Sequence, residues 1–119
     1  MLRGIRGAIT VNQNERNDIL SAVSELLNAM KEANSIDLED IGAIIFSSTP
    51  DLDTAFPAAA ARSLGWHEVP LFGTQEIDNP LGLPHCIRVL ILWNTELPQK
   101  SIRHVYLRDA VRLRQDIIR

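Results

Sequence analysis

The sequence predicts one domain of the α+β class (mixed α/β), with a five-stranded mixed sheet, one long helix and one short helix. Three observations support this prediction. The chain has 119 residues, the length of one domain, and is 45% hydrophobic and 23% charged, as soluble globular proteins are. Five short apolar segments end at turn-forming residues, as strands do, whereas one long segment repeats its apolar residues at helical spacing. Because neither repeats nor low-complexity segments divide the chain, we expect residues 1–119 to fold as one unit.

The first half of the chain contains two strands and both helices. Residues 2–11 have the pattern of a strand, and residues 14–33 repeat apolar side chains as an amphipathic helix does, with acidic residues near the start. Residues 35–40 form a polar turn that leads into residues 41–48, whose continuous apolar run predicts a buried strand. Residues 57–64 are rich in Ala, begin with Pro and are followed by Gly, which predicts the short helix.

The second half contains the other three strands. Residues 69–75 are β-branched and aromatic enough for a strand, and residues 78–84 form a loop rich in turn residues. Residues 86–95 have the strongest strand pattern in the chain, and residues 102–107 alternate as a fifth strand. Residues 108–114 are long enough for one or two helical turns.

Two of these strands, residues 41–48 and 86–95, are apolar on both faces and therefore need cover on both sides of the sheet. One long helix cannot cover both faces. The short helix, a curled sheet or another subunit would have to cover the second face. We favour another subunit, because a chain of this size buries only roughly 60–70% of its surface by itself.

The charged residues are unusual, because 10 of the 12 basic residues are Arg although the net charge is -3. Arg grips carboxylate or phosphate through two parallel hydrogen bonds, so this bias suggests a few placed anion-binding groups. Basic residues gather after residue 100, but acidic and apolar residues interrupt them and aromatic residues make up only 5% of the chain. We therefore do not expect nucleic-acid binding.

Cys86 is the only cysteine, so an internal disulfide is impossible and a reducing cytoplasm is the expected location. Residues 1–10 lack the apolar core of a signal sequence, and the aliphatic run at residues 89–93 is too short for a bilayer. We expect no membrane segment. The three histidines lack the spacing of metal ligands, and the sequence has neither a serine nucleophile elbow nor a glycine-rich phosphate loop. We expect no metal.

Arg88 is the most informative charged residue, because it lies inside an otherwise apolar strand. A guanidinium buried there is costly unless an anion or a carboxylate meets it. One interpretation is an internal ion pair with Glu76 or Asp78, and the other is that Arg88 binds an anionic ligand. Tyr106, the only tyrosine, is either a core residue or a polar contact in a pocket.

Five strings of residues, taken together, resemble the AroH class of monofunctional chorismate mutases nearly end to end, in the same order and with similar gaps. They are Arg3-Gly4-Ile5-Arg6-Gly7-Ala8, Thr49-Pro50-Asp51-Leu52 followed by Phe56-Pro57-Ala58, Gln75-Glu76-Ile77-Asp78, Cys86-Ile87-Arg88-Val89, and Ile102-Arg103-His104-Val105-Tyr106-Leu107.

The resemblance implies a homotrimer whose sheets pack into a barrel-like core, with active sites at the subunit interfaces. It also implies an isomerase of the shikimate pathway to aromatic amino acids, which converts chorismate to prephenate by a Claisen rearrangement. Such an enzyme needs no cofactor and no covalent intermediate, so chorismate, prephenate and copies of the same chain are the implied partners.

The resemblance also assigns roles to residues. Arg88 is expected to donate to the ether oxygen and a carboxylate of chorismate, and Glu76 to hold the ring hydroxyl opposite it, so these two are the expected catalytic residues. The residues expected to bind substrate or to form the walls and mouth of the pocket are Arg6, Tyr106, Phe72, Gly73, Thr74, Gln75, Phe56, Arg62, Leu113 and Arg114. Gly73 and Ala59 depart from the family pattern, in which cysteine and lysine are common at these positions.

Two other interpretations remain open at this stage. A non-catalytic oligomer that senses a small carboxylate would keep Arg6 and Arg88 but would not need Glu76 opposite them. Alternatively, Arg88 and Glu76 form a plain ion pair in a trimer that binds no ligand.

Overall fold

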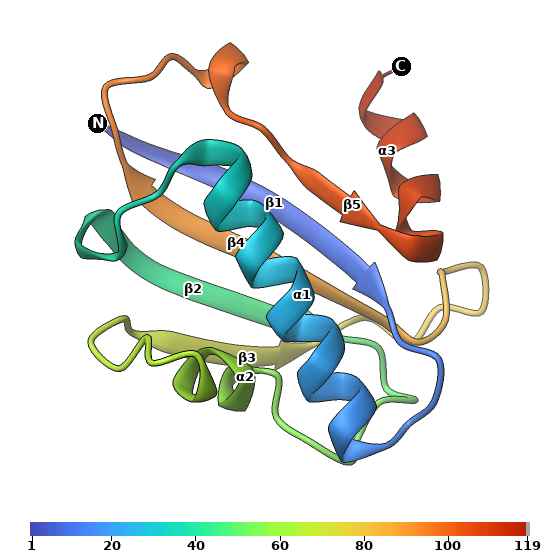
Figure 1. Cartoon of the computed structure of the whole chain (residues 1–119). Coiled ribbons are helices and arrows are strands. Elements are labelled where there is room, and N and C mark those ends of the chain that lie inside the picture. The colour runs from blue at the N-terminus through green and yellow to red at the C-terminus, as the bar shows by residue number, and fades with distance from the viewer. Residues whose placement is uncertain (119) are drawn as a thin grey trace.

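The computed structural model describes the backbone of residues 1–118 and the side chains of residues 1–114 (Figure 1). Its strands and helices follow the predicted order, with small shifts at their ends. The regular elements are β1 (Leu2–Thr10), α1 (Arg16–Asn34), β2 (Ile41–Ser48), α2 (Ala58–Ser63), β3 (Leu71–Gln75), β4 (Cys86–Asn94), β5 (Val105–Leu107) and α3 (Val111–Ile118), with short 3-10 turns at Leu38–Asp40, Gln99–Ser101 and Arg108–Ala110.

The strands form one five-stranded sheet in the order β3-β2-β4-β1-β5. β4 pairs antiparallel with both β1 and β2, whereas β1 pairs parallel with β5 and β2 pairs parallel with β3. The predicted mixed sheet is therefore confirmed. β1 lies between two strands from the last third of the chain, so the N-terminal segment sits inside the sheet and not at its edge.

Both α1 and α2 pack on the same face of this sheet, which we call the helix face (Figure 1). The apolar side chains that recur along α1 point into this layer, as the helical spacing predicts. The fully buried core formed there includes Ile19, Val23, Leu26, Leu27 and Met30 of α1 and Ile5, Ile9, Ile44, Phe46, Ile87 and Ile91 of the strands. No helix of the described residues is long and apolar enough to cross a membrane.

Gly7 lets α1 pack closely against β1. A Cβ atom at this position would overlap Met30 Sδ and would lie 3.2 Å from Leu26 Cδ1. Any larger residue would have to push the helix or its side chains away from the strand. The distance between α1 and the sheet at this point therefore depends on glycine at position 7.

The opposite face of the sheet, which we call the open face, has little cover. Ile45, Leu90 and Leu92 on this face are only partly buried, and the side chain of Phe72 is 65% exposed. The short helix does not close this face, because α2 lies with α1 on the other one. Among the described side chains, the loop before β4, the turn Arg108–Ala110 and the start of α3 pack onto it, in a small cluster around Ala8, Cys86 and Ala110.

Candidate functional site

Strand register brings three of the predicted site residues together on the open face. Ala8 in β1 lies opposite Arg88 in β4 and opposite Tyr106 in β5. Arg6 is two residues before Ala8, so its side chain leaves the same face of β1. Two guanidinium groups and a phenol from three neighbouring strands therefore face one region.

A cavity of about 370 Å³ lies in this region. Its volume is in the range of small-molecule sites. Leu113 of α3 forms one of its walls, as expected for this residue. The residues that line the cavity are Arg6, Gly7, Ala8, Ile45, Ser47, Arg88, Val89, Leu90, Tyr106 and Leu113. Ile45, Ser47 and Leu90 were not among the predicted site residues, although strand alternation and the β2–β4 register place them beside Arg88.

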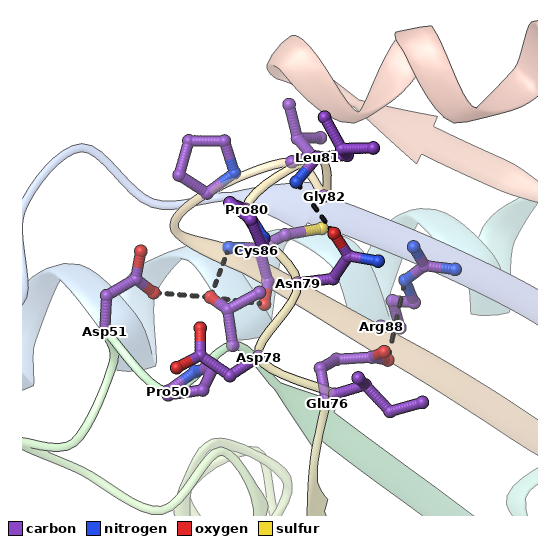
Figure 2. Close-up of a pocket in the computed structure, with 14 residues that line it drawn as sticks. Pro50, Asp51, Glu76, Asp78, Asn79, Pro80, Leu81, Gly82, Cys86 and Arg88 are labelled. Atoms are coloured by element: carbon purple, nitrogen blue, oxygen red, sulfur yellow. Dashed lines mark hydrogen bonds and ion pairs between the residues drawn. The ribbon is translucent and has the colours of Figure 1, made fainter.

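Glu76 reaches Arg88 from the end of β3. Its backbone N–H donates to the carbonyl of Ser48 at 2.9 Å, which extends the β2–β3 pairing by one residue. Its carboxylate then lies 3.5 Å from Nε of Arg88, as Figure 2 shows. Of the two carboxylates expected near this arginine, Glu76 makes the ion pair, and Asp78 lies farther along the loop.

The expectation that Arg88 is buried is wrong for the single chain. The Arg88 side chain is 50% exposed and that of Glu76 is 27% exposed, because both lie on the open face. The apolar residues around Arg88 in the sequence point alternately to the helix face and to this open face. Arg88 is therefore available to a ligand and does not need Glu76 to compensate for full burial.

The loop of residues 77–84 lines a second, open cavity of about 470 Å³ beside the ion pair, which Arg88, Glu76 and Cys86 also line (Figure 2). Burial raises the pKa of the Cys86 thiol to about 11. At neutral pH the thiol is therefore protonated and lacks the nucleophilic form.

A hydrogen-bonded network fixes the C-terminal end of this loop, at His85. The hydroxyl of Thr49 donates to the carboxylate of Asp51, which also accepts the backbone N–H of His85 at 3.0 Å. Burial opposes ionisation of this carboxylate, but the hydrogen bonds from Thr49 and His85 outweigh it and lower the pKa of Asp51 below its ordinary value. The loop is therefore anchored at both ends, at Glu76 and at His85.

The remaining predicted site residues do not reach, within one chain, the cavity between Arg6, Arg88 and Tyr106. Phe56, Gly73, Thr74 and Gln75 line a separate hollow of about 760 Å³. Phe72, Arg62 and Arg114 line neither the cavity at Arg88 nor this hollow, and all three side chains are exposed. A Cβ atom on Gly73 would meet no atom within 4 Å, so packing within the chain does not require glycine there.

The arrangement around Arg88 suits a small dianion. Arg6 and Arg88 supply two cations that can each form paired hydrogen bonds to a carboxylate, and Tyr106 adds a hydroxyl. Glu76 places one negative charge at the edge of the same region. The described residues contain no group of three or more His, Cys, Asp or Glu side chains that could hold a metal ion.

Comparisons with known proteins find the same family that the sequence resembles. A family model described as chorismate mutase type I matches residues 2–117. The chorismate mutase AroH of Thermus thermophilus is 55% identical over 118 residues, which cover 98% of this chain and 97% of that protein. The corresponding protein of Bacillus subtilis (strain 168) is 46% identical, with coverage of 98% and 93%. A solved structure of a chorismate mutase from Clostridium thermocellum superposes with a TM-score of 0.90 at 46% identity, covering 92% of this chain and 97% of that one.

Proposed function

The chain belongs to the type I chorismate mutase family, and we propose that it converts chorismate to prephenate in the cavity between Arg6, Arg88 and Tyr106. The observation that carries this proposal is the convergence of these three side chains on one face, with the Glu76 carboxylate 3.5 Å from Arg88. A site with two cations and one opposed carboxylate matches the charges of the substrate and of its rearrangement.

The reaction is an intramolecular Claisen rearrangement. An ether C–O bond breaks while a C–C bond forms, so the transition state carries partial negative charge on the ether oxygen and partial positive charge on the ring. Catalysis requires groups that stabilise this polarised state more than they stabilise bound substrate. The chemistry itself needs neither a nucleophile nor a redox group, which suits a site whose thiol, Cys86, is buried and protonated.

Arg88 is the group we assign to the ether oxygen. Its backbone is fixed in β4, and its Nε lies 3.5 Å from the Glu76 carboxylate, which restrains the guanidinium before substrate arrives. A fixed donor of this kind stabilises developing negative charge without reorganising during the reaction. Glu76, beside Arg88 at the edge of this region, would stabilise the positive charge on the carbon skeleton and accept the ring hydroxyl.

Arg6 and Tyr106 are assigned to a substrate carboxylate. Because the reaction has one reactant, the enzyme gains nothing from bringing two molecules together. Positioning instead selects the reactive diaxial conformer of chorismate, which requires its carboxylates to be held at fixed points. Adjacent strands carry the two side chains, so the β1–β5 pairing sets their separation.

We propose further that the active enzyme is a homotrimer in which a neighbouring chain completes each site. Phe56 is 81% exposed and Phe72 is 65% exposed, and aromatic residues are enriched in the buried cores of protein–protein interfaces. These residues, with Arg62, Thr74 and Arg114, are predicted site residues that one chain leaves away from Arg88. The partly buried apolar side chains of the open face would then form the barrel-like core between subunits.

The cytoplasm is the proposed location, within the pathway to aromatic amino acids. The single buried thiol of Cys86 fits a reducing compartment.

The test is direct. Purified protein should consume chorismate, followed as loss of its diene absorbance, in buffer with a chelator and no added cofactor. Light scattering should give three times the chain mass of 13.3 kDa. A folded trimer that binds a dicarboxylate analogue without turnover would instead favour a carboxylate sensor, and a monomer with full activity would contradict the shared site.

A further inference from the structure

β5 is a short edge strand, and side chains secure its start. Before the regular pairing with β1 begins at Gly7 and Val105, the side chain of Asn34 holds both backbone groups of Arg103. Asn34 Oδ1 accepts the Arg103 N–H at 2.9 Å, and Nδ2 donates to the Arg103 carbonyl at 2.9 Å. Asn34 is only 8% exposed, so these bonds are shielded from water.

His104 makes the next link. Its Nδ1 accepts the backbone N–H of Arg6 at 2.9 Å, directly before the first paired residues of β1 and β5. A backbone carbonyl accepts such an N–H within a regular parallel pair. Here the imidazole takes that place, which requires a neutral ring whose proton is on Nε2.

We propose that His104 is a positioning residue of the active site, which fixes the register of β5 against β1 where Arg6 and Tyr106 enter the cavity. The inference rests on the proposed function, in which these two side chains bind a substrate carboxylate. Arg6 is the residue whose backbone N–H the ring accepts, and Tyr106, two residues after His104, lines the cavity together with Arg6. Because β5 has only three residues and one neighbouring strand, each link to β1 is a large share of what holds it.

The same geometry makes the link sensitive to protonation. A proton on Nδ1 turns the acceptor into a donor that faces the Arg6 N–H. Burial of the ring lowers the pKa of His104 below its ordinary value, and the Arg6 guanidinium on β1 lowers it further. On α1, the residues near the start of β5 are the uncharged Asn34 and Met30, and the Arg108 guanidinium beyond β5 pairs with Glu25. The link is therefore intact at neutral pH and is lost in acid.

Two variants and one control test the proposal. His104→Leu removes the acceptor, whereas His104→Asn keeps an oxygen close to the position of Nδ1 and does not titrate. His67→Leu removes an exposed histidine on the turn after α2 and serves as the control. The readouts are KM and kcat for chorismate between pH 5 and pH 8, and hydrogen exchange of the Arg6 amide.

In His104→Leu we expect faster exchange of the Arg6 amide and a KM raised on the order of fivefold, with kcat nearly unchanged, because one hydrogen bond that orients a binding group is lost. In His104→Asn both values should return close to wild type. The wild-type KM should rise as the pH falls below 6.5, and the Asn variant should lack that rise.

The proposal is overturned if His104→Leu keeps the wild-type KM and Arg6 exchange, or if the Asn variant is as impaired as the Leu variant. If the Leu variant does not fold, the comparison of wild type with His104→Asn decides, since identical pH profiles overturn the proposal. A wild-type protein that fails to turn over chorismate refutes the proposed function instead, and the exchange of the Arg6 amide then still tests the link to β5.

Discussion

Replacing Glu76 by Gln separates a catalytic role of the ion pair from a structural one. The change keeps the size of the side chain and removes its charge. In the wild-type protein the Glu76 carboxylate lies 3.5 Å from Arg88 Nε, and the side chains of Glu76 and Arg88 are 27% and 50% exposed. A pair this close gains about 1 kcal/mol in water, and measured values for exposed pairs are about 0.2–1 kcal/mol. We therefore expect the variant to lose at most about 1 kcal/mol of unfolding free energy, which is about 4 °C in Tm for a chain of this size.

The effect on turnover should be much larger. Loss of a preorganised charge opposite the developing cation should lower kcat on the order of 100-fold, the effect commonly measured when one electrostatic group is removed from an active site. The assay is loss of chorismate absorbance, with thermal unfolding followed by circular dichroism on the same samples.

Glu25→Gln provides a matched control for this experiment. It removes the carboxylate of a second half-exposed ion pair, in which Arg108 lies 3.2 Å from Glu25 outside the cavity. We expect a similarly small loss of stability and an unchanged kcat. If Glu76→Gln lowered Tm by far more than the control and left kcat near that of wild type, the pair would serve the fold and the catalytic assignment would be wrong.

Two further substitutions test the site and the packing beneath it. Arg88→Lys keeps the charge but loses the planar pair of donors, so kcat should fall strongly while the circular dichroism spectrum and Tm stay close to wild type; near-normal activity would refute the ether-oxygen role. Gly7→Ala should cost about 1–3 kcal/mol in urea unfolding, because the new methyl group overlaps Met30 Sδ. Adding Met30→Val should give a combined cost smaller than the sum of the two, with a coupling of about 1 kcal/mol, and strictly additive costs would contradict the overlap.

Elements with a strong local pattern could be predicted closely from the sequence. β2 has the predicted bounds, because it is a continuous apolar run that ends at turn residues. α1 begins and ends within two residues of its prediction, because its apolar residues repeat at the helical period. β5 begins at Val105, three residues later than predicted. The alternation there is genuine, but Asn34 holds the backbone of Arg103 and the His104 ring bonds to β1, so these residues do not pair as a strand.

The arrangement of the site residues could not be predicted from local sequence patterns. The convergence of Arg6, Arg88 and Tyr106 requires the register of three strands that are far apart in the sequence, and only the family resemblance supplied it. The family prediction is confirmed, and the anion-binding role that composition suggested for the arginines stays a prediction. The exposure of Arg88 was predicted wrongly because an apolar run does not reveal which face of the sheet lacks cover.

The position of β1 in the sheet has a consequence for how the protein folds. Its two neighbours are β4 and β5, which end at Asn94 and Leu107, so β1 leaves the ribosome long before either of its partner strands has been made. Pairings between such distant segments slow folding, because a long loop must close before its contacts are gained. The cavity that Arg6 lines is therefore assembled last, and a nascent chain stopped before β4 holds an unpaired apolar strand that is prone to aggregate.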